Sequence, residues 1–202
     1  VKRALTTLFS ALALCDAQAQ TQAQALTPSF APLIKPTGGV WDSGNGFVFD
    51  LGKKKALKVR QSVSGIACHP TAPQNRPCLV VFDEGTQARY ATLSNGKLVM
   101  DGESVRFPGI AGELDAEAAT TDGRYVYVAG SHSAKRSDCS NNPHSRHVIR
   151  MALDPQTGRA LTQGHADTGR LWPVMQAQPA LAPFVGEGKC LGSAPEGINI
   201  EG

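Results

Sequence analysis

From residue 40 onward, apolar residues occur in short runs that are separated by turn-forming residues. The runs lie at 62–68, 78–83, 89–93, 97–100, 116–120, 124–129 and 146–153, with a further strand-like run at 56–59. None of them continues into the sustained spacing of apolar residues that marks an amphipathic helix. Short runs bounded by Gly, Asn, Asp and Pro are typical of antiparallel strands. The pattern therefore predicts an all-β fold.

Three of the breaks between runs carry specific turn chemistry. Asn95-Gly96 and Asp122-Gly123 each separate two strand-like runs, and both pairs tolerate the positive φ angles that tight hairpins require. The segment 154–158 (Asp-Pro-Gln-Thr-Gly) combines a Pro that presets φ with a Gly that reverses the chain. We expect β-hairpins at all three places.

A four-residue pattern near the middle of the chain returns at its end. Residues 115–118 (Asp-Ala-Glu-Ala) and 199–202 (Asn-Ile-Glu-Gly) lie 84 residues apart, which is twice 42, and 63–66 echoes them with Ser64 in the place of Glu. A four-stranded propeller blade has a similar length. The spacing therefore favours a β-propeller, with a β-sandwich as the alternative.

The amount of chain limits this interpretation. Residues 39–202 would supply about four blades, and the last residue falls within a strand-like motif. Because an unclosed propeller leaves sheet edges unpaired, we expect an incomplete propeller domain, the front part of a longer protein.

The N-terminus has the three parts of an export signal. Lys2 and Arg3 precede an apolar run over 4–14, and small residues at 17 and 19 offer a cleavage site. We expect a signal peptide over 1–19 and a flexible lead-in over 20–38, and hence a periplasmic or extracellular protein. A lipid anchor on Cys15 is disfavoured, because Leu14 occupies a position that prefers a small residue.

Composition adds two constraints. The chain carries 20 Lys+Arg against 17 Asp+Glu, a net charge of +3 that is too small and dispersed for a nucleic-acid surface, and only the N-terminal segment resembles a membrane sequence. Export would leave four cysteines in an oxidising compartment. The favoured pairs are Cys68 with Cys78, which flank a Pro-rich loop, and Cys139 with Cys190, although four cysteines allow three pairings.

Acidic residues form the first candidate site. Because residues i and i+2 of a strand share a face, and propeller blades bring equivalent strands together, carboxylates from separate motifs could converge. Such a set suits calcium, which accepts six to eight oxygens. The alternative is that Glu117 and Glu201 serve structure by accepting backbone N–H bonds. The candidate metal ligands are Glu113, Asp115, Glu117, Glu196, Asn199 and Glu201.

A loop rich in donors forms the second candidate site. Ser131, Arg136 and Arg146 could hold an anion, and His132 could act as acid or base, together with Glu117 and Glu201 as catalytic carboxylates. The alternative is a solvated loop held by Cys139. Ser131 is disfavoured as a nucleophile because no Gly-x-Ser-x-Gly elbow surrounds it.

Residues 113–119, 122–133, 145–150 and 196–202 resemble a bacterial family of secreted proteins of unknown function that is related to esterase-like phytase propellers. Members of that family are longer, and the resemblance assigns no catalytic residue. It implies hydrolysis of a phosphoester or other ester, with calcium, on a small anionic or ester ligand. The alternative is a non-catalytic ligand-binding or scaffold propeller. Oligomeric state is not indicated by the sequence.

Overall fold

The structure is a computed structural model that describes residues 39, 46–49, 51–70 and 74–202. One compact unit extends from Val40 to Gly202. The predicted signal peptide and the predicted lead-in lie outside the described residues.

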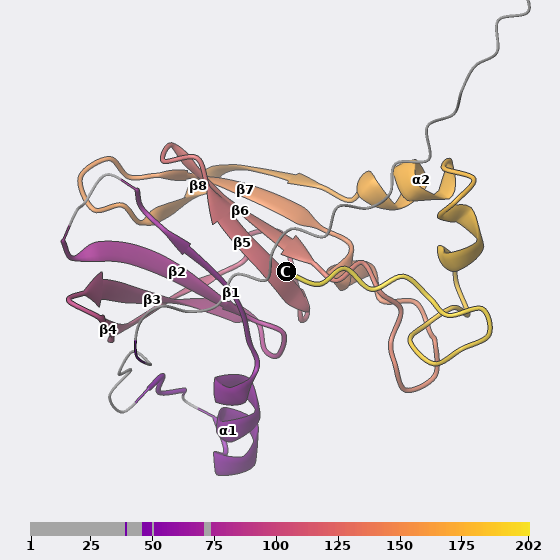
Figure 1. The fold of residues 1–202 in the computed structure, drawn as a ribbon, viewed down its shortest axis with the longest axis horizontal. Helices are drawn as coiled ribbons and strands as arrows, with labels where there is room; N and C mark the ends of the chain where they lie inside the picture. The colour runs from indigo at the N-terminus through magenta and orange to yellow at the C-terminus, as the bar shows by residue number, and fades with distance from the viewer. Residues whose placement is uncertain (1–38, 40–45, 50, 71–73) are drawn as a thin grey trace, which may run out of the picture. The chain divides into compact units, whose positions relative to one another are not determined.

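The first sheet is an antiparallel meander of four strands, paired in chain order (Figure 1). Its strands are β1 (Val63–Cys68), β2 (Arg76–Phe82), β3 (Gln87–Ser94) and β4 (Lys97–Arg106). Strand β2 is buried over its last five residues, whereas β4 forms an edge and is largely exposed. The predicted hairpin at Asn95-Gly96 is confirmed: both residues have positive φ, and Ser94 pairs with Lys97 across the turn.

The second sheet repeats this topology. Its strands are β5 (Ala116–Thr121), β6 (Tyr125–Gly130), β7 (Val148–Leu153) and β8 (Ala160–Thr168), again paired in chain order. Both remaining hairpin predictions are confirmed, since Gly123 and Gly158 have positive φ and join consecutive strands. In the second of these turns, the Asp154 carboxylate accepts N–H bonds from Gln156 and Thr157, each at 2.8 Å.

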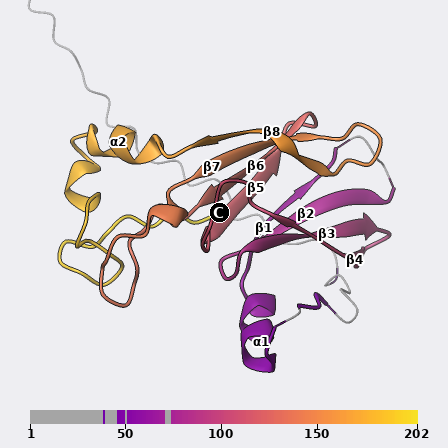
Figure 2. The same cartoon turned by 180° about the vertical axis from the view of Figure 1, so that it is seen from behind.

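The two sheets share the main hydrophobic core. Val81 and Tyr90 of the first sheet pack in one cluster with Val128 and Ile149 of the second. The two sheets approach closely at Gly65 of β1, where a Cβ atom would lie 2.7 Å from the backbone nitrogen of Ala119 in β5. Only glycine fits there, so β1 and β5 can lie side by side, as both views show (Figure 2).

Helices and loops complete the described chain. The helices are α1 (Lys53–Gln61) and α2 (Leu171–Gln176), with 3₁₀ turns η1 (Pro143–Ser145) and η2 (Ala182–Phe184). Helix α1 buries only Val59, which packs against Phe47 and Phe82 in a second cluster. Around α2, Trp172, Met175 and Val185 form a third cluster.

Two expectations need correction. The run at 56–59 is helical rather than extended, because a single buried position on a Lys-rich segment suffices to dock α1. The described residues contain two four-stranded sheets, where the spacing had indicated about four blades. The reason is that β1 begins at Val63 and β5 at Ala116, further apart than 42 residues, and that residues 169–202 form helices and loops instead of strands.

The two predicted disulfides, Cys68–Cys78 and Cys139–Cys190, are both present. The first joins paired residues of β1 and β2, and the second joins the loop after β6 to the segment after η2. Disulfides are compatible with an extracellular or periplasmic location. Among the residues that the structure describes, no helix has both the length and the apolar character needed to cross a bilayer.

Candidate functional site

A cleft of about 860 Å³ lies where the first strands of the two sheets meet the end of the chain. Its lining is strongly charged. The acidic side chains are Asp83, Glu84, Glu113, Asp115, Glu117 and Glu201, and the basic ones are Lys58, Lys135 and Arg136. Five of the six predicted metal ligands, all except Glu196, line this cleft together with Arg136, which was predicted to bind an anion.

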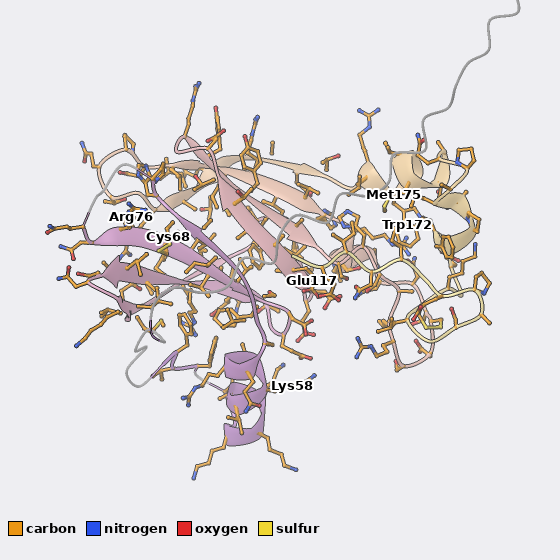
Figure 3. All side chains as sticks on the ribbon, viewed as in Figure 1. Lys58, Cys68, Arg76, Glu117, Trp172 and Met175 are labelled. Atoms are coloured by element: carbon orange, nitrogen blue, oxygen red, sulfur yellow. A yellow bond between two sulfur atoms is a disulfide. The ribbon has the colours of Figure 1, made fainter. Side chains whose placement is uncertain are left out.

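Three carboxylates form the centre of the cleft. Asp83 follows β2, Asp115 precedes β5 and Glu117 lies within β5, and one oxygen of each lies within 4.8 Å of the others. Asp83 thus comes from the first sheet and the other two from the second. In Figure 3, Glu117 lies among a group of side-chain oxygens, and Lys58 projects from α1 below it.

A bulge in β5 sets the direction of Glu117. Ala116 pairs with Gly130 and Ala118 pairs with Ala129, so Glu117 is an extra residue in its strand. The same irregularity occurs in β1, where Val63 pairs with Phe82 and Gly65 with Val81, leaving Ser64 as the extra residue. Bulges commonly re-aim a side chain beside a functional site. Both Glu117 and Ser64 line the cleft.

Asp115 is held by its backbone and by two serines. Its φ of 55° lies in the left-handed region, which Asp tolerates better than most residues. Its carbonyl oxygen accepts the N–H of Ser131 at 2.9 Å, and its carboxylate accepts hydrogen bonds from the hydroxyls of Ser131 and Ser133. Both hydroxyls bond the same carboxylate oxygen, Oδ2, and so hold the Asp115 side chain in the lining of the cleft.

Mutual repulsion and burial perturb two of the acids. Burial, followed by the charge of Glu201 and then those of Asp83 and Asp115, raises the pKa of Glu117 to about 7. A side-chain hydrogen bond with Asp115, followed by burial, raises the pKa of Asp83 to about 7. Neighbouring carboxylates cannot all stay ionised at low cost without a compensating cation. Near neutral pH the centre is therefore partly protonated.

The end of the chain brings a third segment to this centre. The N–H of Ile200 donates to the carbonyl of Ser131 at 2.8 Å, and the side-chain amide of Asn199 donates to the Glu201 carboxylate. At Gly202, the nearest backbone atoms include carbonyl oxygens of Glu117 and Ser64. The three segments singled out as an internal repeat, around residues 64, 117 and 201, thus meet at one place.

Basic side chains border the acids. Lys58 of α1 forms an ion pair with Glu84, whose hydrogen bond raises the pKa of the lysine. The lysine is two-thirds exposed, so this pair is a weak counter-charge. Lys135 and Arg136 enter the lining from the loop that Cys139 holds in place.

His132, predicted as a catalytic acid or base, does not line the cleft. It is fully buried, with φ of 56°, and its Nδ1 lies 2.8 Å from the carbonyl oxygen of Gly130, to which it donates. Burial lowers the pKa of the imidazole, and the neighbouring charges of His147 and Arg146 act in the same direction. In this position His132 contributes to packing.

Three other predicted residues also lie outside the lining of the cleft. Ser131 is buried behind Asp115, and Arg146 stacks on Trp172 with its Cζ 3.5 Å from the ring centroid. Glu196 accepts the N–H of Gly192 at 3.2 Å. Trp172 and Arg146 thereby anchor the segment that follows the second sheet.

Asp83, Lys58 and His144 line the cleft although the sequence did not single them out for it. In the sequence, Asp83 and Glu84 have the features of a solvated turn that follows a strand. Antiparallel pairing explains their position, because the residue after β2 must lie beside the start of β1, where the N–H of Asp83 donates to Ser62. The signal available in the sequence was that Asp83 directly follows the apolar run at 78–82.

The donor set suits a hard divalent cation. Carboxylates, an amide and backbone carbonyls are the ligands that calcium prefers, and its coordination geometry is flexible. Cation binding would displace the protons that Asp83 and Glu117 hold near pH 7. The carboxylates can thus hold a divalent cation. An anionic ligand could then lie between this cation and the basic side chains of Lys135 and Arg136.

Comparison of the chain with known protein families, with curated proteins and with solved structures finds no match. The relationship to esterase-like phytase propellers therefore stays a prediction from the sequence.

Proposed function

We propose that this chain belongs to a secreted or periplasmic β-propeller protein that binds calcium in the acidic cleft and hydrolyses a phosphoester or related ester there. The observation that carries the proposal is the convergence of Asp83, Asp115 and Glu117, from two sheets, within 4.8 Å. Two of these groups have a pKa near 7 in the absence of a cation.

The strand connections support a propeller over a sandwich. Each sheet is a sequential meander, whereas sandwiches commonly exchange strands between sheets through Greek-key connections. The first strands, β1 and β5, are neighbours and carry equivalent bulges at Ser64 and Glu117. In a propeller the equivalent strands of successive blades surround a common axis. The two sheets would then be adjacent blades.

Export is supported by the disulfides. Disulfides such as Cys68–Cys78 and Cys139–Cys190 persist in the periplasm or outside the cell, and are rare in a reducing cytoplasm. A signal peptide over residues 1–19 completes this part of the proposal.

The chain's own residues suggest how an ester would be processed. Asp83, Asp115 and Glu117 would hold the cation, with Asn199 and Glu201 beside them, and Lys135 and Arg136 would bind the anionic part of the ligand. When bound, the cation would polarise the ester oxygen and lower the pKa of a nearby water. Glu201, which lies beside these ligands in the lining, would accept a proton from that water.

A second candidate is a protein that binds the same ligand without turnover. It is favoured by the burial of His132 and Ser131, which removes the expected imidazole and hydroxyl from the cleft. The same cation and basic border would then serve recognition.

The test combines binding and turnover. Calorimetry with calcium should show one site in the wild type and at least about tenfold weaker binding in the double variant Asp83→Asn/Glu117→Gln. Glu196→Gln is the matched control, since Glu196 lies outside the lining of the cleft. Absence of calcium binding, or equal binding by the double variant, would contradict the site.

Turnover distinguishes the two candidates. Calcium-dependent release of p-nitrophenol from p-nitrophenyl phosphate or p-nitrophenyl acetate, lost in the double variant, would support hydrolysis. Calcium binding with no release from either probe would favour recognition without turnover.

A further inference from the structure

A second cavity, of about 260 Å³, lies between α1 and strands β3 and β4. Among the residues that the structure describes, the two cavities have no lining residue in common. Its wall combines apolar and basic side chains, and the residues that matter are Phe49, Leu51, Lys55, Val59, Arg89 and Arg106.

Arg89 is the central charged group of this cavity. Its guanidinium stacks on Phe49, with Cζ 4.6 Å from the ring centroid, so one face of the group is covered by the ring. Nη1 has a distant acceptor, the carbonyl of Gly102 at 3.5 Å. Nε is buried and has no hydrogen-bond partner among the residues that the structure describes.

The arginine therefore has an unmet requirement for an acceptor. A guanidinium stays charged in proteins, and leaving its buried N–H unpaired costs free energy. Burial also lowers the pKa of Arg89. Nε itself is shielded from the cavity, so an occupant would offer its acceptor to the terminal nitrogens of Arg89.

The charge of the lining defines the sign of that acceptor. Lys55 and Arg106 join Arg89 in the wall, and no carboxylate is among the described residues that line the cavity. Three cations around a small volume attract an anion. A carboxylate matches the fork of an arginine better than a spherical ion, because it can accept two parallel N–H bonds.

The remaining wall is apolar. Val59 is 2% exposed and belongs to the cluster with Phe47 and Phe82, and Phe49 packs edge-on against Phe82 at 5.3 Å. Leu51 is 42% exposed at the opening. An occupant with an apolar tail would cover this surface and exclude water from the charged pair.

We propose that this cavity binds a small monocarboxylate with a short apolar chain, the carboxylate on Arg89 and the chain against Phe49, Leu51 and Val59. The volume is slightly below the range of about 300–1,000 Å³ that holds drug-sized ligands, so the occupant is small. The site is separate from the proposed calcium site and does not depend on it.

The test uses octanoate as the probe, with the whole protein in EDTA so that the carboxylate cannot bind through calcium. Calorimetry or NMR titration should show saturable binding of octanoate. Arg89→Gln should weaken binding about tenfold, the size expected from loss of a charge-assisted hydrogen bond. Arg124→Gln, at an exposed arginine in the turn between β5 and β6, is the matched control and should bind as the wild type does.

Further probes separate charge from apolar contact. Octylamine, with the same chain and opposite charge, should not bind, and inorganic phosphate should bind far more weakly than octanoate. If Arg89→Gln fails to fold, Arg106→Gln and Lys55→Gln, at exposed positions, should each weaken octanoate binding measurably. No octanoate binding, equal binding of octylamine, or binding unchanged in all three variants would overturn the proposal.

Discussion

At the scale of single residues, Glu117 shows how a candidate binding residue can lower the free energy of unfolding of its own fold. Its side chain is 7% exposed, and three carboxylates act on it. Its pKa is about 7 in the folded chain, against an ordinary value of 4.5. The folded state therefore holds a proton on Glu117 over a range in which the unfolded state has released it.

The sign of the resulting pH dependence follows from proton binding. Between about pH 4.5 and 7 the folded protein binds more protons than the unfolded protein, so the free energy of unfolding falls as pH rises. Asp83 contributes in the same direction. The loss of stability caused by ionising Glu117 in the folded protein is complete above about pH 7 and absent below about pH 4.5.

Glu117→Gln should remove this loss of stability. In EDTA at pH 8, we expect the melting temperature of the variant to exceed that of the wild type by about 2–4 °C, the size of 1 kcal/mol in a domain of this length. At pH 5 the two proteins should be alike, because Glu117 is then protonated in the folded wild type. Scanning calorimetry at both pH values checks this, with Glu196→Gln as the control. A variant less stable than wild type at pH 8 would contradict the electrostatic account.

The same protons should compete with calcium. Because the cation binds the ionised carboxylates, calcium affinity should fall about tenfold for each protonated ligand per pH unit below 7. Between pH 8 and pH 6 we expect a loss of about 10–100-fold, measured by calorimetry. The Asp83→Asn variant should show a shallower dependence, since one titrating group is gone. A constant affinity over this range would exclude Asp83 and Glu117 as ligands.

At the scale of elements, local chemistry predicted the turns better than the strand pairing. Asn95-Gly96 and Asp122-Gly123 were identifiable because positive φ is a property of single residues. The bulges at Ser64 and Glu117 were not, because a bulge exists only relative to the partner strand. The acidic motifs were recognised, but Asp83 joins them only through the pairing of β2 with β1.

The helices were missed for a related reason. Helix α1 buries one residue, so its sequence has no apolar stripe, and tertiary contact decides its conformation. His132 shows the converse limit: its sequence neighbours indicated a polar loop, yet it is fully buried. Residue types identified the chemistry of the cleft, and only the fold determined which of them reach it.

The disulfides connect separate elements and should have separable effects. Cys139–Cys190 closes a separation of 51 residues and holds the segment that leads to Asn199 and Glu201, where the N–H of Gly197 donates to Cys190. Cys68–Cys78 closes a separation of 10 within one hairpin. By loop-closure entropy their removal should cost about 4 and 3 kcal/mol.

Calcium affinity should separate the two bonds more clearly than stability. Cys139→Ser/Cys190→Ser should weaken calcium binding several-fold, because Glu201 is then poorly positioned beside Glu117. Cys68→Ser/Cys78→Ser is the matched control, and in the part of it that remains folded the affinity should be unchanged. Equal losses in both variants would assign the effect to general destabilisation.

At the scale of the whole described unit, the acidic centre lies at a junction between its parts. Asp83 belongs to the first sheet, Asp115 and Glu117 to the second, and Glu201 to the segment after α2. Gly65 permits the close approach that forms the junction. Without a cation, the same junction concentrates like charges. A bound cation would therefore turn a repulsive contact between the sheets into an attractive one.

Calcium should accordingly stabilise the unit as a whole. At a free concentration 100 times the dissociation constant, binding to the folded state alone contributes about 2.7 kcal/mol, which corresponds to a rise in melting temperature of about 5–10 °C. Because the cation ligands come from both sheets, the two sheets should still unfold together in one thermal transition when calcium is bound. Scanning calorimetry at pH 8 with and without calcium measures both quantities, and Asp83→Asn/Glu117→Gln should abolish the rise while Glu196→Gln retains it. A calcium effect confined to one of two separate transitions would mean that the carboxylates of the two sheets do not share a cation.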